Sequence, residues 1–136
     1  MNLELIANNP TNKREGPAIL MLHGMWHGAW CWEYFLDDFA ELGYQAYAMS
    51  LSNHANSPKK KSLNLLSIND YLEDLRGVVD SLEQPHILIG HSMGGFIVQK
   101  YLEKYPAPKA VLVAPVPPYG VWAGTFKTIA KFPLAF

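Results

Sequence analysis

Four short apolar runs, spaced along the chain, constrain its fold more than any other feature. They read PAILMLHG at 17–24, YQAYAMSL at 44–51, HILIG at 86–90 and KAVLVA at 109–114. Short continuous apolar runs of this kind are typical of strands that are buried on both faces, as in a parallel sheet. The first dozen residues, which include NLELIANN, could add a further strand at one edge of that sheet.

The segments between these runs have helical periodicity. Residues 29–42 form one predicted helix, which Gly43 ends as a C-cap glycine and whose apolar stripe is Trp32, Phe35, Leu36, Phe39 and Leu42. Ser67 and Asp70 resemble a capping box that starts a second helix, with the stripe Ile68, Tyr71, Leu72, Leu75, Val78, Val79 and Leu82. A third helix is predicted over 93–104. This alternation predicts an α/β fold, with a mostly parallel sheet, right-handed crossovers and helices on both faces.

Composition limits the classes of function. The chain has 136 residues, 49% hydrophobic and 17% charged, which predicts a globular domain, and its formal net charge of −1 argues against nucleic acid or an anionic membrane as a partner. No apolar stretch approaches the roughly 20 residues of a membrane helix, and the N-terminus does not resemble a signal peptide. We therefore expect a soluble, cytoplasmic protein. The single cysteine, Cys31, is interpreted as a packing residue, and Lys59, Lys60 and Lys61 as part of a solvated loop.

The motif GHSMGG at 90–95 follows the third apolar run and opens the third predicted helix. Gly90 and Gly94 lie two residues to either side of Ser92, where a sharp strand-to-helix turn would bring any side chains into collision. Such a turn presents the Ser92 hydroxyl above the sheet. It also leaves the backbone N–H of Met93 free at the helix N-terminus, where it can bind negative charge. Ser92 is therefore a candidate nucleophile.

A second motif, His23-Gly24-Met25-Trp26, ends the first apolar run. An oxyanion hole needs two N–H donors aimed at one point, and each donor stabilises a transition state by about 3 kcal/mol. Gly24 allows the backbone to turn, so the N–H of Met25 is the natural second donor beside that of Met93. Parallel strands end at a common edge, which would bring both motifs together.

Together these motifs resemble the first half of an α/β-hydrolase. LHGMWHGAWCW is similar to the oxyanion strand and loop of that family, GHSMGG to its nucleophile elbow, and KAVLVAPVPP to the strand before its lid. The resemblance covers nearly all of 17–118. It implies that residues 1–118 are the N-terminal part of the hydrolase core, truncated before the last strands, and that 119–136 begin a lid.

The segment SLSNHANSP stands where the family has a DLRGHGxS loop. The Asp of that motif is replaced by Ser50, and its Arg-Gly by Leu51 and Ser52. His54 still aligns, and the resemblance implies that it is structural. This departure questions the usual hydrogen bonding of the loop and leaves the elbow intact.

The resemblance also implies a catalytic acid and a later histidine, in that order, after the nucleophile. No Asp, Glu or His follows Pro115. Among the five histidines, His23 is interpreted as packing and bonding the turn, His27 as lining the pocket mouth or starting a helix, and His54 as a loop staple. His86 would open a strand far from the site, and His91 would point away from Ser92. The spacing of His23 and His27 does not indicate zinc, because the glutamate of HExxH is absent.

These observations predict the N-terminal part of a serine hydrolase that acts on ester or related acyl compounds, without metal or cofactor, and inactive as an isolated chain. Trp26 and Trp122 are candidate substrate-binding residues near a hydrophobic mouth, together with Trp30 and Phe126. The fourth run would be an exposed sheet edge, so we expect a fragment that a complementing C-terminal half could complete. Two alternatives stay open: a hydroxynitrile-lyase-like enzyme, which the HGxxHGAWCW pattern also resembles, and a non-catalytic module that binds a hydrophobic ligand.

Overall fold

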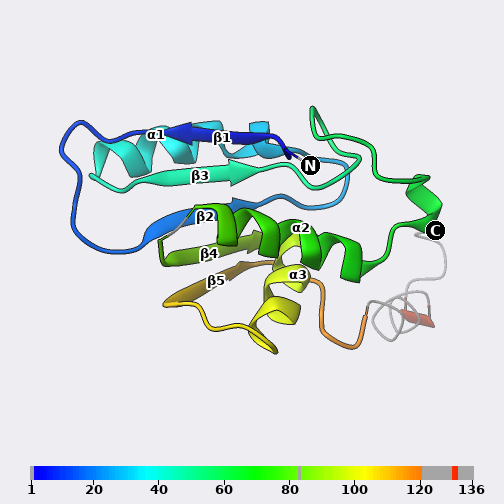
Figure 1. The fold of residues 1–136 in the computed structure, drawn as a ribbon. Helices are drawn as coiled ribbons and strands as arrows, with labels where there is room; N and C mark the ends of the chain where they lie inside the picture. The colour runs from blue at the N-terminus through cyan, green and yellow to red at the C-terminus, as the bar shows by residue number, and fades with distance from the viewer. Residues whose placement is uncertain (1, 83, 121–129, 132–136) are drawn as a thin grey trace.

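A computed structural model describes residues 2–82, 84–120 and 130–131 and contains one five-stranded sheet in the order β1-β3-β2-β4-β5 (Figure 1). Strands β2, β3, β4 and β5 are parallel, and β1 pairs antiparallel with β3. The predicted mostly parallel sheet is confirmed, and so is the edge strand near the N-terminus. The strands are β1 Leu5–Asn8, β2 Ala18–Leu22, β3 Ala46–Met49, β4 His86–His91 and β5 Lys109–Val113.

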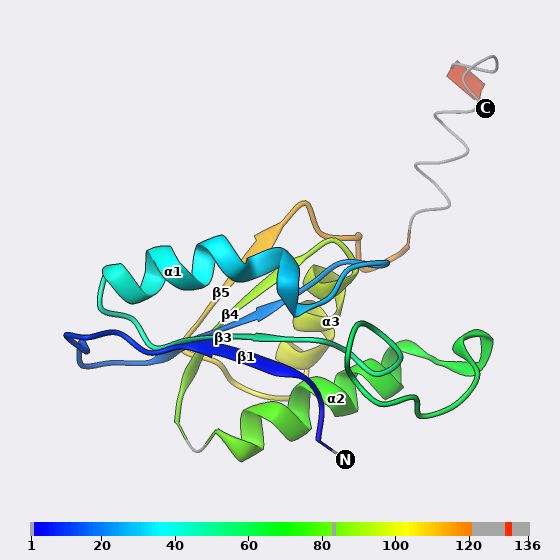
Figure 2. The same ribbon diagram turned by 90° about the horizontal axis from the view of Figure 1, so that it is seen from above.

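Helices cover both faces of the sheet, as predicted. Figure 2 shows α1 on one face and α2 and α3 together on the other. Two short 3₁₀ turns, η1 and η2, precede α1 and α2. The bounds are η1 Ala29–Trp32, α1 Glu33–Glu41, η2 Leu63–Leu65, α2 Ile68–Ser81 and α3 Met93–Leu102. The capping box predicted at Ser67 and Asp70 is present, with each side chain bonded to the backbone N–H of the other residue.

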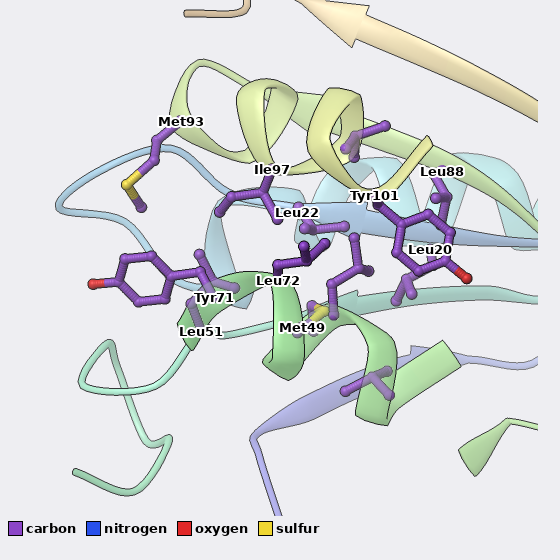
Figure 3. Packing of buried hydrophobic residues seen from close by; sticks show 13 residues of the cluster. Leu20, Leu22, Met49, Leu51, Tyr71, Leu72, Leu88, Met93, Ile97 and Tyr101 are labelled. Atoms are coloured by element: carbon purple, nitrogen blue, oxygen red, sulfur yellow. The ribbon is translucent and has the colours of Figure 1, made fainter. Parts of the chain in front are cut away.

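The larger core lies between the sheet and the pair α2 and α3 (Figure 3). The apolar stripe predicted for α2 packs here against side chains that alternate along the strands, such as Leu20 and Leu22. A smaller core fills the space beneath α1 around Met21, Trp32 and Leu36. Because both faces of the central strand β2 are covered, all five of its residues are buried, which explains its continuous apolar sequence.

The segment predicted as one helix over 29–42 differs from the prediction in two respects. Its first turn is the 3₁₀ turn η1, and α1 ends at Glu41. Phe35 and Leu42, assigned to the buried stripe, are 50% and 59% exposed. Helix α1 contacts the sheet along a narrower stripe than the sequence pattern indicates.

Strand β5 is the last strand of the sheet in the described part of the chain, and all five of its residues are exposed. Val111, Leu112 and Val113 are 47%, 39% and 42% exposed although they are apolar. The exposed apolar edge predicted for this strand is therefore present. The carboxyl ends of β2, β3 and β4 are followed directly by the segments that carry the sequence motifs.

Candidate functional site

Ser92 occupies a backbone conformation that few residues adopt. It lies between β4 and α3 with φ 51° and ψ −115°, in the half of the backbone map that favours glycine. Hydrogen bonds on both sides enforce this conformation. The Ser92 N–H donates to the carbonyl of Val113 at 3.0 Å, and the Ser92 carbonyl accepts from Val116 and Phe96, each at 3.1 Å. The turn at Ser92 is thus anchored to the end of β5 and to the first turn of α3.

Glycines permit the close approach of backbone around this turn. A Cβ atom on Gly90 would lie 2.6 Å from the carbonyl oxygen of Gly94. A Cβ on Gly94 would lie 2.6 Å from the carbonyl oxygen of His23 and 2.7 Å from that of Leu22. Any side chain at either position would therefore collide with backbone atoms, which cannot rotate away. Helix α3 begins directly against the end of β2 for this reason.

The second turn, at 23–27, meets the first. The N–H of His27 donates to the carbonyl of Gly24 at 3.3 Å, and Trp26 has a positive φ of 64°. A Cβ on Gly24 would lie 3.1 Å from the Cβ of Ser92, so the two turns are in van der Waals contact at Gly24. The backbone of Met25 follows at once. The structure therefore places Ser92 beside Gly24, which Met25 follows in sequence, and Met93 opens α3 with an N–H that has no acceptor inside the helix.

His23 is completely buried, and both of its ring nitrogens are bonded. Nε2 accepts from the N–H of Leu51 at 3.1 Å, so the proton lies on Nδ1, which donates to the carbonyl of Gly24 at 2.7 Å. Burial lowers the pKa of His23 to about 4. A neutral ring with both nitrogens occupied has no capacity to take a proton from Ser92, and it holds the turn at Gly24 instead.

Two further histidines lie on the same side of the site. The ring of His27 stacks on Trp30 at 5.5 Å between centroids and meets the ring of His91 edge-on at 6.3 Å. Nδ1 of His27 is 2.9 Å from the carbonyl oxygen of Met25. Both histidines line a cavity of about 260 Å³ whose other walls are Cys31, Trp32, Phe35 and Val113. Burial raises the pKa of the Cys31 thiol to about 11, which keeps it protonated.

The remaining histidines do not reach Ser92. His54 bonds the carbonyl of Ser52 through Nδ1 at 3.0 Å and packs on His23 and Tyr71. His86 begins β4, whereas Ser92 follows its end, and the two are six residues apart along a strand that rises about 3.3 Å per residue. Among the described residues, no side chain forms a hydrogen bond with the Ser92 hydroxyl. Neither His54 nor His86 is therefore placed as a base for Ser92.

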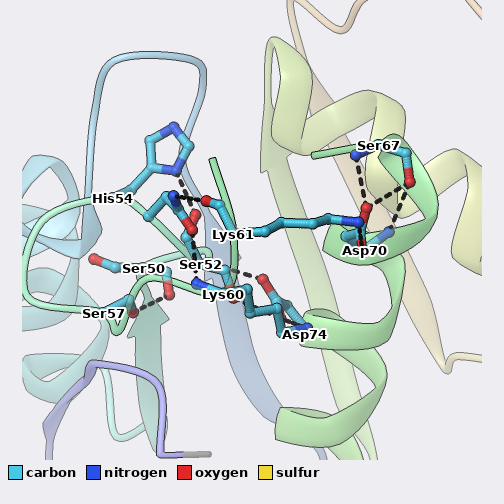
Figure 4. A network of polar contacts seen from close by, with 10 residues as sticks. Ser50, Ser52, His54, Ser57, Lys60, Lys61, Ser67, Asp70 and Asp74 are labelled. Atoms are coloured by element: carbon cyan, nitrogen blue, oxygen red, sulfur yellow. Dashed lines mark hydrogen bonds and ion pairs between the residues drawn. The ribbon is translucent and has the colours of Figure 1, made fainter. Parts of the chain in front are cut away.

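The loop at 50–61 is held by a buried carboxylate that the sequence did not reveal. Asp74 of α2 is 3% exposed and accepts from the N–H of Ser52 at 2.8 Å and from its hydroxyl at 2.9 Å (Figure 4). The ammonium of Lys60 lies 2.7 Å from the same carboxylate. A polar residue inside the apolar periodicity of α2 was the available signal, because a buried charge needs such partners.

The prediction of a solvated lysine loop is wrong for Lys60, whereas Lys59 and Lys61 are exposed. Lys60 is drawn inward to Asp74, and Lys61 pairs with Asp70 at 2.8 Å at the start of α2. Figure 4 shows both lysines crossing from the loop to the helix. The sequence pattern does not show which opposite charges lie nearby in the fold. Here Asp74 lies within reach of Lys60, and Asp70 lies within reach of Lys61.

Of the aromatic residues assigned to the mouth of the site, Trp26 and Trp30 are 86% and 53% exposed at the 23–32 segment. Trp122 and Phe126 lie outside the described residues. Within 2–82, 84–120 and 130–131, no group of three or more His, Cys, Asp or Glu side chains is arranged to hold a metal ion. In the same residues, no helix has both the length and the apolar character that crossing a bilayer requires.

Fold and site together define a mostly parallel α/β protein with a strained serine between a strand and a helix, in contact with a glycine turn. The family model described as "Alpha/beta hydrolase family" matches residues 19–136. The chain belongs to the alpha/beta hydrolase family.

Individual relatives agree with this assignment. The chain is 36% identical to methyl jasmonate esterase 1 of Vitis vinifera over 104 aligned residues. The alignment covers 74% of this chain and 39% of the relative. It is 30% identical over 117 residues to salicylic acid-binding protein 2 of Nicotiana tabacum, covering 83% and 45%. A crystal structure of a probable hydrolytic enzyme from Pseudomonas aeruginosa superposes with a TM-score of 0.76 and 27% identity, covering 88% of this chain and 38% of that one. The chain thus spans less than half the length of these relatives.

Proposed function

We propose that this chain forms the nucleophile-bearing part of a serine hydrolase for small ester or related acyl substrates. Ser92 attacks the carbonyl carbon, and the N–H groups of Met25 and Met93 bind the oxyanion that forms. The observation that carries the proposal is the contact between Gly24 and the strained Ser92, because Met25 and Met93 directly follow these two residues in the chain. The similarity to a plant esterase supports ester substrates.

The base that accepts the Ser92 proton comes from outside the residues described. His23 has no free nitrogen, Nδ1 of His27 and of His54 each lie at a backbone carbonyl, and His86 lies at the far end of β4. A complementing segment supplies the acid and the histidine in this proposal, and it adds to the sheet beside β5, whose apolar residues are exposed. In subtilisin, loss of the catalytic histidine lowers the rate by about 10⁶, so the chain alone should be a very poor catalyst.

Chemical rescue tests the nucleophile without the missing segment. The purified chain is assayed with p-nitrophenyl butyrate, with and without added imidazole as an external base, beside Ser92→Ala. We expect little hydrolysis without imidazole, a faster imidazole-dependent reaction with the chain, and a butyryl group on Ser92 detected by mass spectrometry. Imidazole-dependent rates that are equal in Ser92→Ala would overturn the assignment of the nucleophile.

The same samples separate the alternatives. Release of cyanide from a cyanohydrin, dependent on Ser92, would indicate a lyase. Retention of a hydrophobic ligand by Ser92→Ala, with no acyl-enzyme in the unsubstituted chain, would indicate a binding module. Ser92-dependent hydrolysis at full-enzyme rates without imidazole would show that the base lies within these 136 residues.

A further inference from the structure

The side-chain hydroxyl of Ser50 links the N-terminal segment to the backbone at the start of η1. It is fully buried at the end of β3, and its hydroxyl accepts a hydrogen bond from the N–H of Ala29 at 2.8 Å. Ala29 begins η1 directly after the turn that carries Met25. A hydroxyl that accepts one bond can donate one more, and that of Ser50 donates to the carboxylate of Glu4.

Glu4 enters this network from the N-terminal segment, 46 residues away in sequence. Its carboxylate also accepts from the N–H of Asn56 at 3.3 Å and from its side-chain amide at 2.5 Å. Its backbone is fixed as well, since the Glu4 N–H donates to Ser57 at 2.9 Å and its carbonyl accepts from Ser50 at 3.0 Å. Burial acts to raise the pKa of Glu4, but the bonds from Ser50 and Asn56 outweigh it and lower that pKa, so the carboxylate is ionised at neutral pH.

The start of the turn at 23–27 is also held by the loop that carries Ser50. The N–H of Leu51 bonds His23, and His23 bonds the carbonyl of Gly24. Residues 24 and 29 are therefore both held by neighbouring positions of the 50–57 segment. Gly28, between them, is packed so tightly that a Cβ would lie 2.5 Å from the Cβ of Ala55 and 3.1 Å from the Ser50 hydroxyl. The backbone between these two points, which includes the N–H of Met25, is therefore held at both ends.

We propose that Glu4 is a positioning residue for the oxyanion side of the site, acting through Ser50 on Ala29. The family motif places an Asp where this chain has Ser50, and here the carboxylate is supplied from the N-terminal segment, one side chain further out. The ionised Glu4 carboxylate holds the proton of the Ser50 hydroxyl, so a lone pair of the hydroxyl oxygen faces the N–H of Ala29. This inference has two parts. The catalytic part, that Glu4 affects the rate of the reaction, rests on the proposed function. The mechanical part, that Glu4 restrains the backbone at Ala29, does not.

Amide hydrogen exchange on the 136-residue chain tests the mechanical part. Glu4→Gln keeps the size of the side chain and removes its charge, and the exposed Glu73→Gln is the matched control. We expect the Ala29 amide to exchange about tenfold faster in Glu4→Gln, which corresponds to about 1.4 kcal/mol, and to be unchanged in the control. The amide of Ile89 in β4 should be unchanged in both. Unchanged protection of Ala29 in Glu4→Gln would overturn the proposal.

Ser50→Ala tests whether Glu4 acts on Ala29 through the Ser50 hydroxyl. It removes the hydroxyl and leaves Glu4 in place, so Ala29 should exchange at least as fast as in Glu4→Gln. In the double variant the exchange of Ala29 should be no faster than in Ser50→Ala alone, because the effect of Glu4 passes through the hydroxyl. Additive effects would show that Glu4 merely stabilises the fold, and would overturn the positioning role even if one single variant folded poorly.

The imidazole-rescued reaction distinguishes this failure from that of the proposed function. If both proposals hold, Glu4→Gln lowers the rescued kcat several-fold and leaves KM unchanged. If exchange at Ala29 responds but no Ser92-dependent reaction exists, the proposed function fails while the mechanical link stands. If the rescued kcat is unaffected by Glu4→Gln although Ala29 is loosened, the positioning role in catalysis is overturned.

Discussion

Two neighbouring segments at the carboxyl edge of the sheet are held in different ways. The elbow at 90–95 is fixed by backbone that approaches backbone, with Gly90 and Gly94 at the points of contact. The loop at 50–61 is fixed by side chains, chiefly the carboxylates of Glu4 and Asp74, which come from a distant segment and from a helix. The first kind of constraint depends on the size of a residue, and the second depends on charge and hydrogen bonding, so the two should respond to different perturbations.

The elbow should be most sensitive to added volume. In Gly94→Ala the new methyl group meets two backbone oxygens at 2.6 and 2.7 Å, and we expect the free energy of unfolding to fall by more than about 3 kcal/mol. Gly77→Ala is the control, because a Cβ there has no neighbour within 4 Å and the residue lies inside α2. This control should be neutral or stabilising by about 0.5–1 kcal/mol. Equal urea midpoints for the two variants would contradict the packing argument.

The link between the two segments should be sensitive to pH. Burial lowers the pKa of His23 to about 4, below its ordinary 6.5, so the unfolded chain binds a proton that the folded chain does not. The associated stability is complete above pH 6.5 and is lost as the pH falls toward 4, by about 3 kcal/mol.

His23→Gln lacks this titration and keeps an acceptor for Leu51. Urea unfolding from pH 7 to pH 4 should therefore show a shallower dependence in His23→Gln than in the unsubstituted chain. A residual slope of the same sign is expected from His86, whose pKa burial also lowers. Parallel pH profiles for the two chains would rule out His23 as a neutral buried link.

The loop at 50–61 should be sensitive to loss of a carboxylate. Asp74→Ala leaves the buried N–H and hydroxyl of Ser52 without their acceptor, and we expect a loss of about 2 kcal/mol. The loss stays below that of a fully buried ion pair because Lys60 is 25% exposed and can reach water. In the control Asp80→Ala, an exposed pair with Arg76 at 3.5 Å is removed, which should cost less than about 0.5 kcal/mol. Similar denaturation midpoints in both variants would refute the role of Asp74.

The sequence predicted those features whose cause is local. The continuous apolar runs, the capping box at Ser67 and the glycines around Ser92 each express a requirement of the nearby backbone, namely burial on two faces, an orphan N–H, or space for a close approach. The exposed edge at β5 also followed from the order of the runs. The family was recognisable for the same reason, since its motifs are turns between consecutive elements.

The tertiary structure decided the polar contacts between distant segments. Nothing near Ser50 in sequence indicates that Glu4 bonds it, and nothing near Lys60 indicates that it pairs with Asp74. The same holds for His23, whose Nε2 is occupied only because Leu51 lies beside it in the fold. A hydrogen bond depends on distance and direction between two groups, which a linear pattern does not encode, whereas burial and backbone shape leave a periodic trace in the sequence.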